Sequence, residues 1–108
     1  MKDDRLYLIH ISECIERIEK NIGEGGGKAF MDSDLVQDAV IRNLQTLAES
    51  ATRISEELQE KHPEVDWFKI RGFRNVLVHD YLGVDLKRVW NIIENDLSRL
   101  KVAVEKML

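Results

Sequence analysis

The chain has 108 residues, of which 44% are hydrophobic and 33% are charged, with one cysteine and one proline. A chain of this length forms one domain, so we expect a single domain over residues 1–108. The single cysteine, Cys14, excludes an internal disulfide and fits a reducing compartment. No apolar run approaches the roughly 20 residues that a membrane span needs, and the charged first residues do not resemble a signal peptide. We therefore expect a cytoplasmic protein that does not contact a membrane.

The formal net charge is −4, which argues against a protein that coats nucleic acid, since such binding draws on many lysines and arginines. The charge is unevenly distributed. Between residues 67 and 90, five basic residues stand against two acidic ones, a local excess of three positive charges. A small cationic site on an acidic protein suits one phosphate-bearing target better than a long duplex. The same residues also suit ordinary solvated helix surfaces, so both interpretations stay open.

Hydrophobic residues that recur every three to four positions indicate an all-helical chain. We expect helices over about residues 3–22, 33–61, 67–81 and 86–107. Asp32, Asp66 and Asp85 are the predicted N-caps of the last three, and Pro63 ends the second. Helices of these lengths with short connections predict an all-α, up-and-down four-helix bundle, with room for a short extra helix.

Two local patterns suggest sites that the sequence does not otherwise support. Residues 23–28, Gly-Glu-Gly-Gly-Gly-Lys, resemble a phosphate-binding loop, but a predicted helix precedes them and Ala29 follows the lysine, so we expect a flexible connector. His10 and Cys14 have a spacing that suits zinc. A structural zinc site needs four ligands, and the chain has no further cysteine or suitably placed histidine. We predict neither a metal nor a cofactor.

The predicted third helix, residues 67–81, carries the residues of greatest chemical interest. Arg74 falls in the middle of an apolar stripe, where a cation is costly unless an anion meets it. Asp38 and Glu49 of the second helix are candidates for that anion, and the sequence leaves their role open. The stripe consists of Trp67, Ile70, Leu77 and Tyr81.

A second stripe on the same helix makes it apolar on most sides. Such a helix is normally covered by more than one neighbour. A symmetric dimer through this region would supply the cover that one bundle lacks, so we expect a homodimer. The second stripe consists of Phe73, Val76, Leu77 and Val78.

His79 and Tyr81 follow Arg74 on this helix. At 100° per residue, Tyr81 projects in nearly the same direction as Arg74, whereas His79 lies about 140° away. The three converge if the helix loosens near residues 80–83, or if a second subunit brings its own copy alongside. The structural alternative is an arginine in a buried salt bridge and a histidine that caps a helix end.

The run Arg74-Asn75-Val-Leu-Val-His79-Asp-Tyr81 matches the Arg-x4-His-x-Tyr motif of the HEPN superfamily, and the chain resembles its HepT-like toxin branch. The resemblance implies a small helical homodimer whose paired motifs form the cleft of a metal-independent endoribonuclease, the toxin of a type VII-like toxin–antitoxin pair. It implies Arg74 and His79 as the catalytic pair and Asn75 as a supporting residue. It further implies that an MntA-like nucleotidyltransferase antitoxin adds AMP to Tyr81. Similar sequence also occurs at residues 40–49, 66–73 and 89–93.

These residue types suit RNA cleavage, because RNA carries its own nucleophile in the 2′-hydroxyl group. A histidine that titrates near neutral pH can take or return a proton, and an arginine can bind a phosphate through two nitrogens. Lys69 and Arg71 are candidate phosphate contacts for a tRNA or mRNA substrate. The alternative from another class is a non-catalytic nucleotide-binding or partner-docking module, in which Arg74 holds a nucleotide phosphate.

Overall fold

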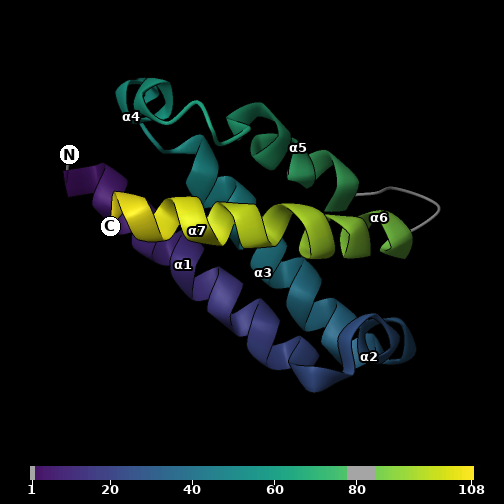
Figure 1. Ribbon diagram of the computed structural model, residues 1–108. Helices are drawn as coiled ribbons and strands as arrows, with labels where there is room; N and C mark the ends of the chain where they lie inside the picture. Colours follow the sequence, from purple (N-terminus) through teal and green to yellow (C-terminus); the bar gives the residue numbers. More distant parts are fainter. Residues whose placement is uncertain (1, 78–84) are drawn as a thin grey trace.

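The computed structural model describes residues 2–77 and 85–108, and this part of the chain is helical without a strand (Figure 1). The predicted all-α fold is confirmed. Within the described ranges, every helix is too short or too polar to cross a bilayer. The elements are α1 (Lys2–Ile22), a 3-10 turn η1 (Gly23–Gly25), α2 (Gly26–Asp32), α3 (Asp34–Thr52), α4 (Glu56–Lys61), α5 (Trp67–Leu77), α6 (Leu86–Asn91), a π-helical segment η2 (Ile92–Leu97) and α7 (Ser98–Met107).

Four helical rods form an up-and-down bundle, as predicted (Figure 1). The segments α6, η2 and α7 follow one another as one rod. Helix α3 runs back along α1, α5 packs on α3, and α7 crosses α1. The start of α1 lies near the C-terminal residue, where Arg5 Nη1 donates to the carbonyl oxygen of Leu108 at 3.4 Å.

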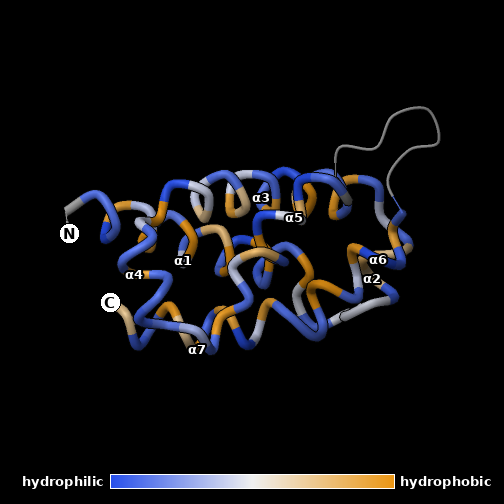
Figure 2. The backbone as a smooth tube through the Cα atoms, turned by 90° about the horizontal axis from the view of Figure 1, so that it is seen from above, coloured by the Kyte–Doolittle hydropathy of each residue, from blue (hydrophilic) through white to orange (hydrophobic). Residues whose placement is uncertain are grey.

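The core lies between the rods, and hydrophobic residues turn toward this space (Figure 2). Full burial of a leucine, isoleucine or phenylalanine side chain contributes roughly 1.5–3 kcal/mol, so these contacts dominate the stability of the bundle. In α1, hydrophobic residues three to four positions apart, Leu8, Ile11, Ile15 and Ile18, are buried, and Ile22 at the end of the helix is partly buried. The largest side chains with essentially no exposure are Phe30, Ile11, Ile15, Ile18, Leu44, Leu47, Val40, Val89 and Val104.

The prediction of one continuous second helix over residues 33–61 is wrong, because two separate helices, α3 and α4, occupy this range. The Ser55 hydroxyl caps α4 by accepting from the Leu58 N–H at 3.2 Å. The buried carboxylate of Asp4 in α1 holds this break, since it accepts from the Ser55 N–H at 2.8 Å and from the Ser55 hydroxyl at 2.6 Å. Hydrophobic periodicity continues through the break at Ile54, so the local sequence does not show it.

Two of the three predicted helix caps are confirmed. Asp66 Oδ1 accepts from the Lys69 N–H at 3.0 Å, and Asp85 Oδ1 accepts from the second and third residues of its helix at 3.1 and 3.3 Å. The third prediction is wrong by one residue: Ser33, not Asp32, caps α3 and accepts from the N–H three positions later at 3.2 Å.

The glycine-rich segment is helical, contrary to the expected flexible connector. Gly23 and Gly26 both have φ of 62°, in the left-handed region that favours glycine. The buried ring of Phe30 in α2 stacks on Trp90 with 5.7 Å between ring centroids. A Cβ atom on Gly27 would lie 3.0 Å from the Trp90 indole, so a larger residue at this position would require the indole to shift by a few tenths of an ångström. Helix α2 thus belongs to the core and is a short extra helix of the kind anticipated.

Candidate functional site

The motif begins in the last turn of α5. Arg74 and Asn75 are both exposed there. His79 and Tyr81 lie in residues 78–84, outside the described residues. The extension of the third helix beyond Leu77, and the convergence of the motif residues, therefore stay predictions.

Helix α5 is positioned by its buried face. The Trp67 indole N–H donates to the His62 carbonyl oxygen at 3.1 Å, which ties the helix start to the preceding loop. Trp67, Ile70 and Phe73 are 6%, 5% and 2% exposed, and they anchor α5 against the bundle. The anchored face fixes which side chains of α5 reach solvent.

Arg74 is not buried, which corrects its expected place within an apolar stripe. Its side chain is 54% exposed, and Nη1 lies 3.5 Å from Oε2 of Glu49 in α3. By helical spacing Arg74 is only about 40° from Ile70, but a long side chain can carry its charged end to the surface. Of the two candidate anions, Glu49 is the one that pairs with it, whereas no ion pair of Asp38 occurs among the described residues.

The exposure of this ion pair decides between two interpretations. A pair at 3.5 Å with partners 54% and 49% exposed is a surface pair, so the buried-salt-bridge alternative is wrong. Surface pairs of this kind contribute roughly 0.2–1 kcal/mol. Glu49 also lies 3.8 Å from Arg53, so one carboxylate is shared between two guanidinium groups. Arg74 can therefore turn to a phosphate at little cost in stability.

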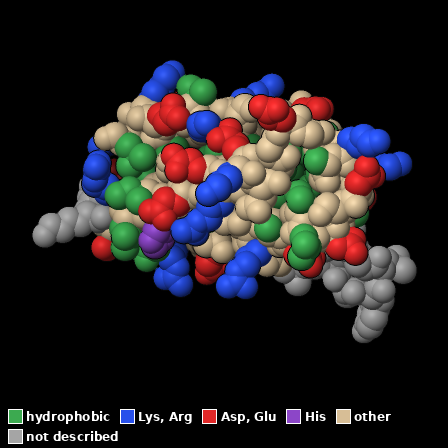
Figure 3. Space-filling model, turned by 90° about the horizontal axis from the view of Figure 1, so that it is seen from below, with side chains coloured by type: hydrophobic (Ala, Val, Ile, Leu, Met, Phe, Trp, Pro, Cys, Tyr) green, Lys and Arg blue, Asp and Glu red, His purple; other side chains and the backbone are tan. Residues whose placement is uncertain are grey.

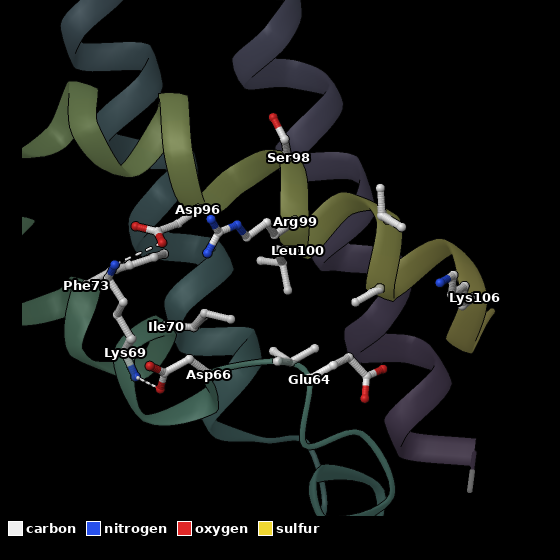
Figure 4. Close-up of a pocket in the computed structure, with 13 residues that line it drawn as sticks. Glu64, Asp66, Lys69, Ile70, Phe73, Asp96, Ser98, Arg99, Leu100 and Lys106 are labelled. Carbon is white, nitrogen blue, oxygen red and sulfur yellow. Dashed lines mark hydrogen bonds and ion pairs between the residues drawn. The ribbon is translucent and has the colours of Figure 1, made fainter.

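Lys69 and Arg71 do not converge with Arg74 in this structure. Lys69 Nζ lies 2.9 Å from Oδ1 of Asp96 in η2 (Figure 4). Arg71 Nη1 donates to Oε1 of Gln59 in α4 at 2.8 Å. Each would have to exchange its partner to hold RNA, and their role as RNA contacts stays a prediction.

A cavity of about 550 Å³ lies between α5 and α7 (Figure 4). Ile70, Phe73 and Leu100 supply buried apolar walls, and charged side chains surround the opening. Asp96 Oδ2 is buried beside it and has no hydrogen-bond partner in the described structure. At the other end, a hydrogen bond from His62 lowers the pKa of the Glu64 carboxyl group.

Charges of both signs are mixed over the surface. On the face shown in Figure 3, acidic and basic side chains are interspersed, with hydrophobic side chains in small groups between them. Exposed pairs such as Lys101 with Glu19, 2.8 Å apart, neutralise one another. The described side chains on this face form no broad cationic field for nucleic acid, in keeping with the net charge of −4.

Comparisons with known proteins agree on one family. A family model described as "Ribonuclease HepT-like" matches residues 11–107. A protein of Thermococcus cleftensis named "Probable ribonuclease HepT" is 35% identical over 101 residues, which cover 94% of this chain and 92% of that protein. The "mRNA nuclease HepT" of Shewanella oneidensis is 30% identical over a 112-residue alignment, which covers 82% of this chain and 83% of that protein.

A longer relative and a solved structure extend the comparison. A protein of Methanocaldococcus jannaschii named "Gamma-glutamylcyclotransferase and putative RNase MJ0434" is 34% identical over 107 residues, 99% of this chain, but the chain spans only 48% of that protein. Among solved structures, a tri-AMPylated Shewanella oneidensis HEPN toxin in complex with an MNT antitoxin matches with a TM-score of 0.72. That match covers 97% of this chain and 96% of the toxin at 22% identity, which shows a shared fold.

Proposed function

Because the chain belongs to the HepT-like ribonuclease family, we propose that it is the RNA-cleaving toxin of a type VII-like toxin–antitoxin pair, acting on mRNA or tRNA in the cytoplasm. The observation that carries the proposal is the placement of Arg74. Its guanidinium group stands at the surface at the start of the Arg-x4-His-x-Tyr motif, in a half-exposed ion pair with Glu49. A cation so placed is available to the phosphate of a substrate.

The proposed reaction needs no metal ion. The 2′-oxygen forms a bond to the adjacent phosphorus while the bond from phosphorus to the 5′-oxygen breaks, which leaves a 2′,3′-cyclic phosphate and a 5′-hydroxyl group. His79 takes the proton of the 2′-hydroxyl or gives one to the 5′-oxygen, and such acid–base catalysis contributes roughly 10²–10⁴-fold in rate. Arg74 stabilises the charge on the phosphate oxygens, and the exposed amide of Asn75 supplies a further donor.

A homodimer through the region of the motif completes this mechanism. One histidine does not act as base and acid in the same step, whereas two copies of His79 at one cleft can divide these roles. The exposure of Arg74 and Asn75 at the end of α5 supports the proposal, because it leaves both side chains accessible to a second subunit and to RNA.

We further propose that an MntA-like nucleotidyltransferase restrains the toxin by modifying Tyr81. The tyrosine oxygen attacks the α-phosphorus of ATP, AMP is transferred, and pyrophosphate leaves. Each added phosphate brings negative charge close in sequence to Arg74, where it competes with RNA. The support comes from the solved toxin of the same fold, which carries AMP groups and is bound to its MNT antitoxin.

A cleavage assay in EDTA tests the proposal. Purified protein is incubated with tRNA and with mRNA beside His79→Ala and Arg74→Ala. We expect the unmodified chain to cut RNA and each variant to lose activity by about 100-fold or more. Equal cleavage by all three would place the activity elsewhere. No cleavage, together with nucleotide-dependent thermal stabilisation, would favour the non-catalytic binding module.

A further inference from the structure

A second cavity, of about 430 Å³, lies between α5 and α6 beside the cavity of Figure 4, and we call it the α5–α6 groove. We propose that this groove binds a single-stranded segment of the RNA substrate, with one base stacked on Phe68 and backbone phosphates held by Lys87 and Arg88. The inference rests on the proposed ribonuclease function and deepens it, because it names residues that position the substrate beyond the scissile phosphate.

Phe68 is the first observation. Its side chain is 82% exposed at the mouth of the groove, although its neighbour Trp67 is buried in the core. An aromatic ring open to water on a helix is a stacking platform, since every nucleobase has a face that can cover it. Such stacking tolerates any base, which suits an enzyme that acts on RNA of varied sequence.

The charge of the groove is the second observation. Its lining contains three cations, Lys69, Lys87 and Arg88, and one carboxylate, Asp96. Lys69 already neutralises that carboxylate at 2.9 Å. Lys87 and Arg88 are exposed on neighbouring positions of α6, across the groove from Phe68. A locally positive groove on a chain of net charge −4 complements a polyanion better than it complements another copy of this acidic chain.

The direction of the groove is the third observation. Gly72 lines it, and a Cβ atom built there would meet nothing within 4 Å, so open space lies between the aromatic ring and the cations. By helical spacing, Phe68 and Asn75 project within about 20° of each other and lie about 10 Å apart along α5. A strand stacked on Phe68 is therefore led along α5 toward Asn75, the sequence neighbour of Arg74, whose own side chain projects about 120° away from Phe68 toward Glu49 of α3.

Binding of an uncleavable RNA tests this inference apart from catalysis. The probe is a short, fluorescein-labelled, single-stranded 2′-O-methyl RNA, read by fluorescence anisotropy. We expect Phe68→Ala to weaken binding by about 5- to 150-fold and Phe68→Trp to preserve it. The double variant Lys87→Gln, Arg88→Gln should weaken binding and reduce the slope of log affinity against log salt by about 1.4, the value for two phosphates on a single strand.

Matched variants elsewhere serve as controls. Leu35 on α3 is also 82% exposed, so Leu35→Ala removes an equally exposed hydrophobic side chain outside the groove. Lys20→Gln removes an exposed cation from the end of α1. Both should bind the probe like the parent chain, and thermal melts should show that every variant is folded.

Two results would overturn the inference. The first is parent-like binding by folded Phe68→Ala and by the double variant. The second is a Phe68→Ala variant that binds RNA like the parent chain but has a different molecular mass in analytical ultracentrifugation. That result would assign Phe68 to a contact between protein chains. If the parent chain cuts RNA while these variants bind and cut RNA normally, the proposed role of the groove is wrong and the ribonuclease function stands. If the parent binds RNA through the groove but does not cut it, the function fails and the groove stands.

Discussion

Replacing Arg74 by alanine should separate the stability of the bundle from its activity. Its guanidinium group is 3.5 Å from Glu49, and the two side chains are 54% and 49% exposed. A pair so exposed contributes roughly 0.2–1 kcal/mol, whereas breaking a buried pair costs about 3–5 kcal/mol. We therefore expect the free energy of unfolding to fall by less than about 1 kcal/mol, and the melting temperature by no more than about 5 °C.

The chain offers a matched control in Arg53. Its guanidinium group lies 3.8 Å from the same Glu49 carboxylate and is 58% exposed, but Arg53 is the C-cap residue of α3 and lies 6.0 Å from the Tyr7 ring. Urea denaturation should give similar small losses for Arg53→Ala and Arg74→Ala. RNA cleavage in EDTA should be unchanged for Arg53→Ala and about 10²–10³-fold slower for Arg74→Ala, as for removal of one donor to a developing oxyanion.

The opposite pattern would refute this reasoning. If Arg74→Ala lost about 3 kcal/mol or more in stability, the magnitude expected for a buried pair, and the folded fraction still cleaved RNA at the parent rate, Arg74 would be a structural residue. Equal loss of cleavage in Arg53→Ala and Arg74→Ala would instead assign the effect to the shared carboxylate.

Three further predictions concern the fold. Asp4→Ala removes a buried carboxylate that accepts two hydrogen bonds and should cost about 2–4 kcal/mol in urea denaturation; a loss no larger than that of exposed Asp3→Ala would contradict it. Burial raises the pKa of the Cys14 thiol, so alkylation at mildly alkaline pH should be much slower in the native protein than in urea. The stability that the buried neutral thiol contributes should be lost as the pH rises through the native pKa of Cys14. Equal alkylation rates in the native protein and in urea would contradict the burial of this thiol. Gly27→Val places atoms where the Trp90 indole lies, so it should destabilise the fold by about 1–3 kcal/mol and change the tryptophan fluorescence; an unchanged spectrum and stability would show that the indole moves aside at no cost.

The parts of the fold that depend on local chemistry could be predicted from the sequence. Asp66 and Asp85 cap their helices because a short carboxylate beside a helix start accepts from the first N–H groups wherever the helix lies. The break before α4 could not be predicted, since it depends on a hydrogen bond between Asp4 and Ser55, which are 51 residues apart. The glycines suggested a connector, whereas α2 is held in place by contacts with residues outside this helix: Phe30 stacks on Trp90, and the Gln37 side chain donates to the carbonyl oxygen of Phe30 at 2.9 Å.

In the candidate site, too, the local sequence predicted some features, whereas others depend on contacts between distant parts of the chain. The motif located Arg74 in the sequence, but helical spacing alone placed it in an apolar stripe, because spacing describes Cα positions and not the reach of a long side chain. The choice between Asp38 and Glu49 depended on how α5 packs on α3. The exposure of Phe68 could not be predicted from the sequence, since the hydrophobic residues around it suggested a helix covered on most sides, whereas its ring is 82% exposed beside the groove between α5 and α6.

The chemistry of the RNA ends tests the central claim most directly. The products of cleavage in EDTA are analysed by mass spectrometry, and the assay is repeated with a strand that carries a single 2′-deoxynucleotide at the cut position. The mechanism predicts 2′,3′-cyclic phosphate and 5′-hydroxyl ends, and no cut at the deoxynucleotide. Ends that carry a 5′-phosphate, or an undiminished cut at the deoxynucleotide, would contradict an attack by the 2′-hydroxyl group assisted by Arg74 and His79.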